Sequence, residues 1–206
     1  MEVSVNFAKP VGPYDMVWNK CVSTFCHVEM SMVLEKQTFY NIANRYIPES
    51  YINVVSRLTK QTKHSSSVVH VCFYILWGGV VSLRFLNEHH EDPLCRPPND
   101  PIYTCVKFHV SEKEMSEIVG FNLQQLGKEY DIPRAILLLT TFPMPLTEEV
   151  PSKYFCSQLV LHSLKCVESL EVEKLPNINH MSPLDVYIWL TDGLTDGLTD
   201  GLTDCL

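Results

Sequence analysis

The stretch VVHVCFYILWGGVVSL, residues 68–83, decides the fold class, because it is apolar enough to be either a membrane segment or a pair of buried strands. It carries no formal charge over 16 residues, but a helix needs about 20 apolar residues to cross a bilayer. Residues 68–75 are rich in Val, Phe and Tyr, which strands favour, and Gly78 and Gly79 fit the turn between two strands. The stretch therefore predicts a buried β-hairpin.

Other segments extend the predicted sheet. YDMVW at 14–18, CHVEMSMVLE at 26–35 and IYTCVKFHV at 102–110 are apolar or alternate with a period of two, which indicates strands. Residues 36–67 are more polar and predict an excursion that is partly helical, and residues 87–101 carry the charge and prolines of a surface loop. We therefore expect four or five strands, with residues 36–67 outside the core.

Two helices are predicted after the strands. Ser111 and Glu114 have the spacing of a capping box, and Gly127 tolerates the left-handed turn that ends a helix. A second helix is expected to have Ser152 as its N-cap and Cys156 in its first turn. Its predicted buried side comprises Leu159, Val160, Leu164 and Val167.

Composition limits the classes of protein to consider. The 206 residues, of which 46% are apolar and 19% charged, suit one globular domain. A net charge of −8 disfavours nucleic acid as a partner, because nonspecific phosphate binding requires clustered Lys and Arg. Residues 1–16 contain no apolar run and lack the layout of a secretory signal. We therefore expect a cytoplasmic protein, in a host cytoplasm if the source is viral, with reduced cysteines.

The C-terminal end is repetitive. LTDG occurs three times from Leu190 to Gly201, and LTDC follows it. Asp-Gly pairs favour turns, and a period of four matches neither a helix nor a strand. The sequence therefore predicts a folded domain over residues 1–189 and a disordered tail over residues 190–206.

Cys156 and His27 are the candidate reactive residues. The first turn of a helix stabilises a thiolate through its free amides and its dipole, and a nearby imidazole adds to that effect. Alternation along residues 26–35 places His27, Glu29 and Ser31 on one face of a strand whose other face is apolar. A buried packing thiol and a strand surface that simply faces water are the alternative interpretations.

Five short motifs occur in an order that resembles a known family. They are HVEM at 27–30, GGVVSLR at 78–84, GKEYD at 127–131, YFCSQLV at 154–160 and SPLDVY at 182–187. Together they resemble the circularly permuted papain-like hydrolases of the NlpC type, a group that includes YiiX-like proteins and is distantly similar to lecithin retinol acyltransferase. Permutation in that family places the histidine before the cysteine along the chain.

The resemblance implies an α+β, circularly permuted papain-like fold in which a small antiparallel sheet or barrel packs against helices, including the Cys156 helix. It implies that Cys156 is the nucleophile and His27 the general base of a cysteine hydrolase or acyltransferase that forms an acyl-enzyme. The backbone amide of Cys156 would help to hold the oxyanion. No cofactor is expected. No metal is expected either, because Cys21, Cys26 and His27 lack a second Cys or His pair at the spacing of a zinc site.

The residue that orients the histidine in relatives stands on a strand soon after the histidine strand. Here residues 36–67 interrupt that position, so that Glu35, Thr38, His70 and Tyr74 are all candidates. The alternative function is therefore a catalytically inactive, papain-like binding protein for a lipid or a peptide.

The resemblance implies a small-molecule amide, peptide or lipid-acyl substrate, and the sequence does not choose among them. The apolar residues 135–146, AILLLTTFPMPL, fit either a core strand, which we expect, or the lining of a lipid pocket. No transmembrane segment is predicted, peripheral contact with a membrane stays open, and the sequence does not determine the oligomeric state. A structural or interaction protein that uses its repetitive tail is a third class.

Overall fold

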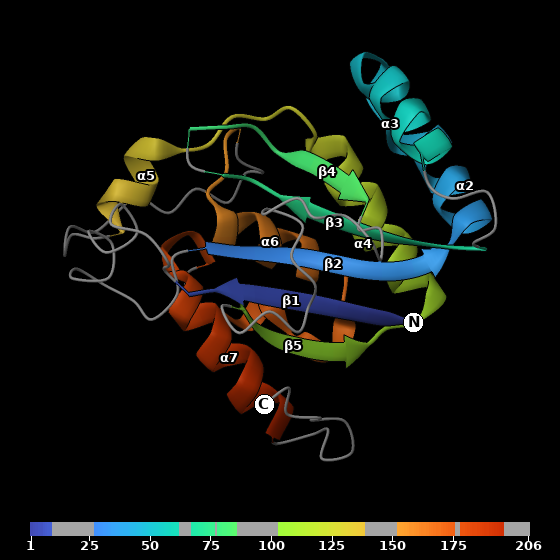
Figure 1. The fold of residues 1–206 in the computed structure, drawn as a ribbon. Coiled ribbons are helices and arrows are strands. Elements are labelled where there is room, and N and C mark those ends of the chain that lie inside the picture. The colour runs from blue at the N-terminus through green and yellow to red at the C-terminus, as the bar shows by residue number, and fades with distance from the viewer. Residues whose placement is uncertain are drawn as a thin grey trace.

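The structure is a computed structural model that describes residues 1–9, 27–61, 67–76, 78–85, 103–138, 152–175 and 178–195. Its centre is a five-stranded sheet of order β4-β3-β2-β1-β5 in which every neighbouring pair is antiparallel (Figure 1). The fold class is α+β. The strands are β1 Glu2–Ala8, β2 His27–Glu35, β3 Val68–Tyr74, β4 Ser82–Phe85 and β5 Tyr103–His109.

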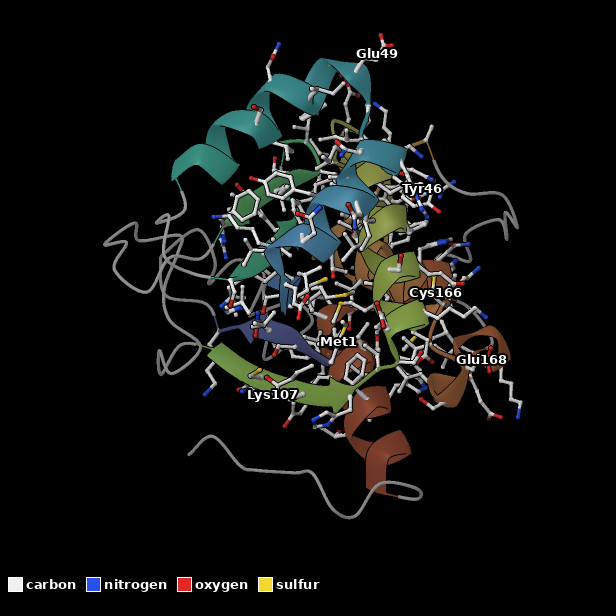
Figure 2. All side chains as sticks on the ribbon, turned by 90° about the vertical axis from the view of Figure 1, so that its right-hand side faces the viewer. Met1, Tyr46, Glu49, Lys107, Cys166 and Glu168 are labelled. Carbon is white, nitrogen blue, oxygen red and sulfur yellow. The ribbon has the colours of Figure 1, made fainter. Side chains whose placement is uncertain are left out.

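Helices pack on this sheet. Figures 1 and 2 show α4 and α6 on the same side of the strands, and α6 contacts β2, α4, α7 and the short helix η3. Within the described ranges, no helix is long and apolar enough to span a bilayer. The α-helices are α2 Lys36–Tyr46, α3 Glu49–Gln61, α4 Glu112–Gln125, α5 Ile132–Leu137, α6 Cys156–Leu164 and α7 Pro183–Thr195; the 3₁₀ helices are η1 Glu168–Leu170, η2 Val172–Lys174 and η3 Ile178–His180.

The two faces of the sheet differ in chemistry. On one face, Val5, Met30 and Phe73 are at most 1% exposed and join the same core as Leu159 of α6. Because side chains alternate along a strand, the neighbouring residues point to the other face. That second face carries polar side chains that are nevertheless buried, namely Ser4, Asn6, Glu29 and Ser31. Helices α4 and α6 therefore pack on the apolar face, and the second face of the sheet carries the buried polar side chains.

The predicted hairpin and the first predicted helix are confirmed. Strands β3 and β4 pair antiparallel on either side of Gly78, whose φ is 69°. At the start of α4, the Ser111 hydroxyl accepts from the Glu114 N–H at 3.2 Å and the Ser111 N–H donates to the Glu114 carboxylate at 2.8 Å. Gly127 ends this helix region with a φ of 84°, as its sequence position predicts. The segment 36–67 is partly helical as expected, because it contains α2 and α3. The expectation that it lies outside the core is wrong, because Phe39, Ile42 and Val55 are at most 5% exposed and belong to the core.

Three expectations about element boundaries are wrong. The folded part does not end at residue 189, because α7 continues to Thr195 and buries Leu190 in the core at 1% exposure. Residues 135–137 are the end of α5 and not a strand, since Asp131 caps that helix by accepting from the Arg134 N–H at 3.1 Å. Ser152 is not the cap of α6, which begins at Cys156.

One strand was not expected at all. Residues 2–8 form β1, which lies between β2 and β5 in the sheet, and Val3, Val5 and Phe7 are fully buried. The strand expected at 14–18, residues 139–146 and the tail from 196 to 206 lie outside the described residues.

Candidate active site

Cys156 is the first residue of α6 and is 5% exposed. Its Sγ accepts hydrogen bonds from the backbone N–H groups of Val28 and Ser157 and from the Tyr130 hydroxyl. Burial raises the pKa of the Cys156 thiol above its usual value, and these donors oppose the rise. The sulfur therefore lies among hydrogen-bond donors that would favour a negative charge on it.

The start of α6 leaves its amides available to the thiol. Phe155 occupies the N-cap position, and no side chain caps the helix there. A Ser or Asp cap would accept from the first amides of the helix. Without such a cap, the N–H groups at the start of α6 lower the pKa of the Cys156 thiol and so partly offset the effect of burial. Because no side chain caps α6, the positive end of the helix dipole acts on the Cys156 sulfur.

Tyr130 reaches the thiol because its segment is hydrogen-bonded on both sides. The Tyr130 N–H donates to the Gly79 carbonyl at 2.9 Å, and the Asp131 N–H donates to the Tyr154 carbonyl at 2.8 Å. Tyr154 lies two residues before Cys156, so these bonds fix Tyr130 next to the start of α6. Burial raises the pKa of the Tyr130 phenol, which keeps it a neutral hydrogen-bond donor.

His27 is the first residue of β2, and its side chain is 15% exposed. The pairing of β2 with β3 stops at Met30 and Phe73, and the backbone N–H of Val28 beyond that point donates to Cys156 Sγ. The structure therefore brings Cys156 to the residue that follows His27. Nε2 of His27 is buried and makes no hydrogen bond within the described part of the chain. Burial, aided by the nearby Arg84 charge, lowers the pKa of His27 to about 4.

Glu29 shares the face of His27 on β2 and carries an ion pair. Arg84 Nη2 lies 2.6 Å from one Glu29 carboxylate oxygen and 2.8 Å from the other, and Oε2 of Glu29 lies 3.9 Å from His27 Nε2. Burial raises the pKa of Glu29, and the Arg84 charge opposes this shift. Glu29 and Arg84 were not among the expected site residues, although the HVEM and GGVVSLR motifs contain them.

The four expected orienting residues are not equally placed. Glu35 ends β2, eight residues from His27, which is a separation of about 26 Å along a strand. Thr38 lies in α2, beyond Glu35. His70 pairs with Val33, also toward that end of β2. Tyr74 alone is next to the site, with its ring 4.8 Å from the Arg84 guanidinium carbon.

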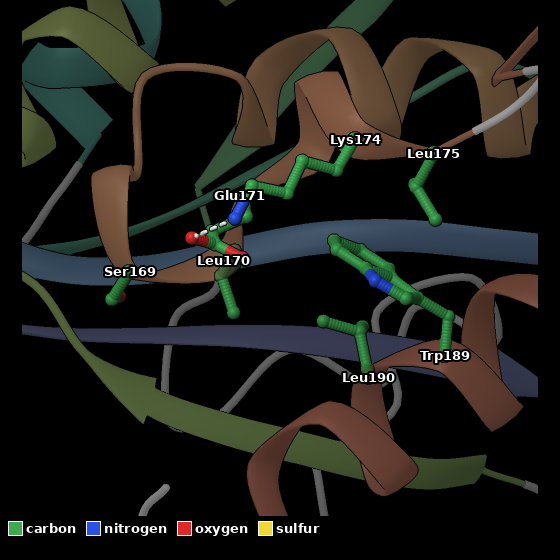
Figure 3. Close-up of a pocket in the computed structure, with 7 residues that line it drawn as sticks. All are labelled: Ser169, Leu170, Glu171, Lys174, Leu175, Trp189 and Leu190. Atoms are coloured by element: carbon green, nitrogen blue, oxygen red, sulfur yellow. Dashed lines mark hydrogen bonds and ion pairs between the residues drawn. The ribbon is translucent and has the colours of Figure 1, made fainter. Parts of the chain in front are cut away.

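Two surface hollows are lined by described residues, and neither includes Cys156 or His27. One, of about 210 Å³, lies between α7 and the 3₁₀ helices; Figure 3 shows Leu175, Trp189 and Leu190 around it and the Lys174 ammonium paired with Glu171 at 2.6 Å. The other, of about 350 Å³, lies between α2 and α3. Within the described ranges, no group of three or more His, Cys, Asp or Glu side chains is placed to hold a metal ion.

The protein is thus an α+β protein in which the N-terminus of a helix brings a cysteine to the end of the central strand of an antiparallel sheet, one residue from a partly buried histidine. Comparison of the chain with family models, with curated proteins and with solved structures gave no match in any of the three.

Proposed function

We propose that the protein is a thiol-dependent hydrolase or acyltransferase in which Cys156 is the nucleophile and His27 the general base. The observation that carries the proposal is the hydrogen bond from the Val28 N–H to Cys156 Sγ, because it puts the thiol beside the backbone of His27. The circularly permuted papain-like fold that the motifs suggest belongs to the same proposal. The antiparallel sheet packed against the Cys156 helix is compatible with it.

The proposed reaction begins from a neutral thiol and a neutral imidazole, because burial raises the pKa of Cys156 and lowers that of His27. In the attack, the S–H bond breaks and its proton moves to the imidazole while sulfur bonds to the carbonyl carbon of an amide or ester. The carbonyl electron pair moves to oxygen, and the amides at the start of α6 stabilise it. The leaving group then takes the proton, and water or another acceptor releases the acyl group.

A noncatalytic lipid- or peptide-binding protein is the second candidate. The observation in its favour is the burial of the thiol, since Cys156 is 5% exposed. A thiol with a raised pKa is also a poor nucleophile unless a base takes its proton.

Alkylation by iodoacetamide, followed by peptide mass spectrometry at pH 7.5, separates the two candidates. An enzyme predicts that Cys156 reacts faster than Cys105 and Cys166, which are the more exposed thiols of the described residues. His27→Ala should slow the reaction at Cys156 at least about tenfold.

The matched control is His70→Ala. His70 is also a histidine on the polar face of the sheet whose pKa burial lowers, but it pairs with Val33, far along β2 from the site. It should leave the rate at Cys156 unchanged. Equal reaction of all cysteines, or a rate at Cys156 that does not depend on His27, would contradict catalysis and favour the binding protein.

A further inference from the structure

A buried carboxylate lies beside the imidazole of His27. Glu29 is 5% exposed, and one Arg84 nitrogen contacts both of its oxygens, at 2.6 and 2.8 Å. Such short distances are typical of charge-assisted hydrogen bonds between a guanidinium and a carboxylate. Because a guanidinium does not lose its proton in proteins, the contact favours the ionised form of Glu29 and fixes its orientation.

The Arg84 side chain, which holds Glu29, is itself held in place. In the register of the sheet, Arg84 on β4 lies opposite Cys72 on β3, and Cys72 lies opposite Ser31 on β2. The guanidinium therefore crosses β3 diagonally to reach Glu29, two residues before Ser31. The small side chain of Cys72, which is fully buried, leaves room for that crossing. The Tyr74 ring 4.8 Å from the guanidinium carbon adds a cation–π contact.

The two nitrogens of the His27 ring meet different surroundings. Nε2, the nitrogen farther from the backbone, is buried, makes no hydrogen bond to the residues that the structure describes, and lies 3.9 Å from Glu29 Oε2. Nδ1 lies nearer the backbone, and the next backbone amide, that of Val28, bonds to Cys156 Sγ. A separation of 3.9 Å is longer than a hydrogen bond, but catalytic contacts are often loose in the absence of substrate.

We infer that Glu29 is the positioning residue for His27: its carboxylate accepts a hydrogen bond from Nε2–H and leaves Nδ1 as the nitrogen that takes the Cys156 thiol proton. The inference rests on the proposed function and adds the third member of the site. When Nδ1 takes the thiol proton as sulfur attacks, the ring becomes an imidazolium, and the Glu29 carboxylate stabilises its positive charge. Arg84 contributes by holding the Glu29 carboxylate in place.

This assignment differs from the pattern of the family that the sequence resembles, in which the orienting residue stands on a later strand. Here the carboxylate comes from the histidine's own strand, two residues on, and the later strand β4 supplies Arg84, which anchors it.

The tautomer of His27 tests the inference without any substrate. Nitrogen-15 NMR of histidine-labelled protein at pH 7, with the His27 signal assigned from its loss in His27→Gln, should show the proton on Nε2 and a bare Nδ1. A neutral ring that carries its proton on Nδ1 would overturn the inference, because Nδ1 could not then act as the base.

Alkylation rates at Cys156 test the role in reactivity. The double variant Glu29→Met, Arg84→Met removes both charges together, which avoids a lone buried charge and keeps the volume similar. It should slow iodoacetamide at Cys156 at least about tenfold in a protein with His27, and less than about twofold in the His27→Ala background, because the two residues act as one unit. Ser31→Ala, on the same buried face, is the matched control and should leave the rate unchanged.

The outcomes separate the two claims. If His27→Ala slows Cys156 but the double variant does not, or if the double variant slows it equally in both backgrounds, the role of Glu29 is overturned and the Cys-His function stands. If His27→Ala has no effect, the proposed function fails, and the Glu29 inference fails with it. Thermal unfolding of each variant confirms that the comparison is made on folded protein.

Discussion

The backbone N–H of Val28 donates a hydrogen bond to Cys156 Sγ, and this single contact joins the start of β2 to the start of α6. The two residues are 128 positions apart in the chain, as their numbers show. Because His27 precedes Val28, the contact brings a helix-terminal thiol to the backbone beside a partly buried histidine.

Tyr130→Phe should raise the pH needed for alkylation of Cys156. The Tyr130 hydroxyl donates to Sγ, and burial already raises the pKa of the thiol, so removal of this donor raises that pKa further. A hydrogen bond to a charged group is worth about 1.5–3 kcal/mol, so the rate at pH 8 should fall about tenfold or more. The measurement is the rate of iodoacetamide labelling from pH 6 to 10.

Tyr154→Phe is the matched control for that experiment. Tyr154 forms a β-bridge with Tyr130, but its hydroxyl donates to the Gln125 side chain at 3.2 Å. Its loss should leave the pH profile of Cys156 unchanged. Identical profiles for the two phenylalanine variants would show that Tyr130 has no special contact with the thiol.

The buried His162 should make the free energy of unfolding fall as the pH falls into the mildly acidic range. Burial, with a smaller effect of the Lys165 charge, lowers the pKa of this histidine to about 4 from 6.5. Between pH 6.5 and 4 the unfolded chain therefore binds more protons at this position than the folded chain, and stability falls as the pH falls. From pH 7 to pH 5 this group alone should remove about 2 kcal/mol of unfolding free energy.

Urea unfolding at pH 7 and pH 5 measures this loss. His162→Gln should lose about 2 kcal/mol less than the wild type between the two pH values, because all other groups titrate in both proteins. An equal loss in the two proteins would contradict a buried, neutral His162.

Gly127→Ala should destabilise the protein more than Gly78→Ala. Both glycines have a left-handed backbone, with φ of 84° and 69°, so each alanine costs about 1–2 kcal/mol for the backbone alone. A Cβ at Gly127 would also lie 2.7 Å from the Tyr51 hydroxyl oxygen, whereas one at Gly78 would have nothing within 4 Å. We expect a further loss of about 1 kcal/mol at Gly127, measured by urea unfolding, and its recovery in Gly127→Ala, Tyr51→Leu. Equal losses at the two glycines would argue against the contact with α3.

Truncation before and after the last turns of α7 should have different effects on stability. A chain that stops after Thr195 should keep the unfolding temperature of the full chain. A chain that stops after Trp189 should lose at least about 2 kcal/mol, because it lacks Leu190, which is 1% exposed and belongs to the core. If both truncated chains unfold alike, the last turns of α7 do not contribute to the fold.

Local patterns predicted the elements whose signals are local. The capping box at Ser111 and Glu114 and the turn at Gly78 need only neighbouring residues, and both form as expected. The strand β1 was missed although Val3, Val5 and Phe7 alternate, because a short strand gives little apolar signal next to polar and proline residues. Its place in the sheet depends on its pairing with both β2 and β5, which the sequence order does not give.

Some residues of the candidate site could be predicted from local sequence and others could not. Cys156 and His27 could be selected because a helix start and a half-polar strand are visible in the sequence. Glu29 could not be, because its role depends on Arg84, 55 residues later on another strand. Tyr130 depends on hydrogen bonds that its segment makes with Gly79 and Tyr154. Residues whose role depends on partners far away in the sequence can be identified only from the folded structure.

Whether Cys156 acts as a nucleophile is tested by offering the protein an activated ester. With p-nitrophenyl acetate at pH 8, we expect a burst of p-nitrophenolate and an acetyl group on Cys156, detected by peptide mass spectrometry. His27→Gln should slow the burst, and Cys156→Ala should abolish it. Acetylation spread over other side chains, with a release of p-nitrophenolate that Cys156→Ala leaves unchanged, would contradict the claim.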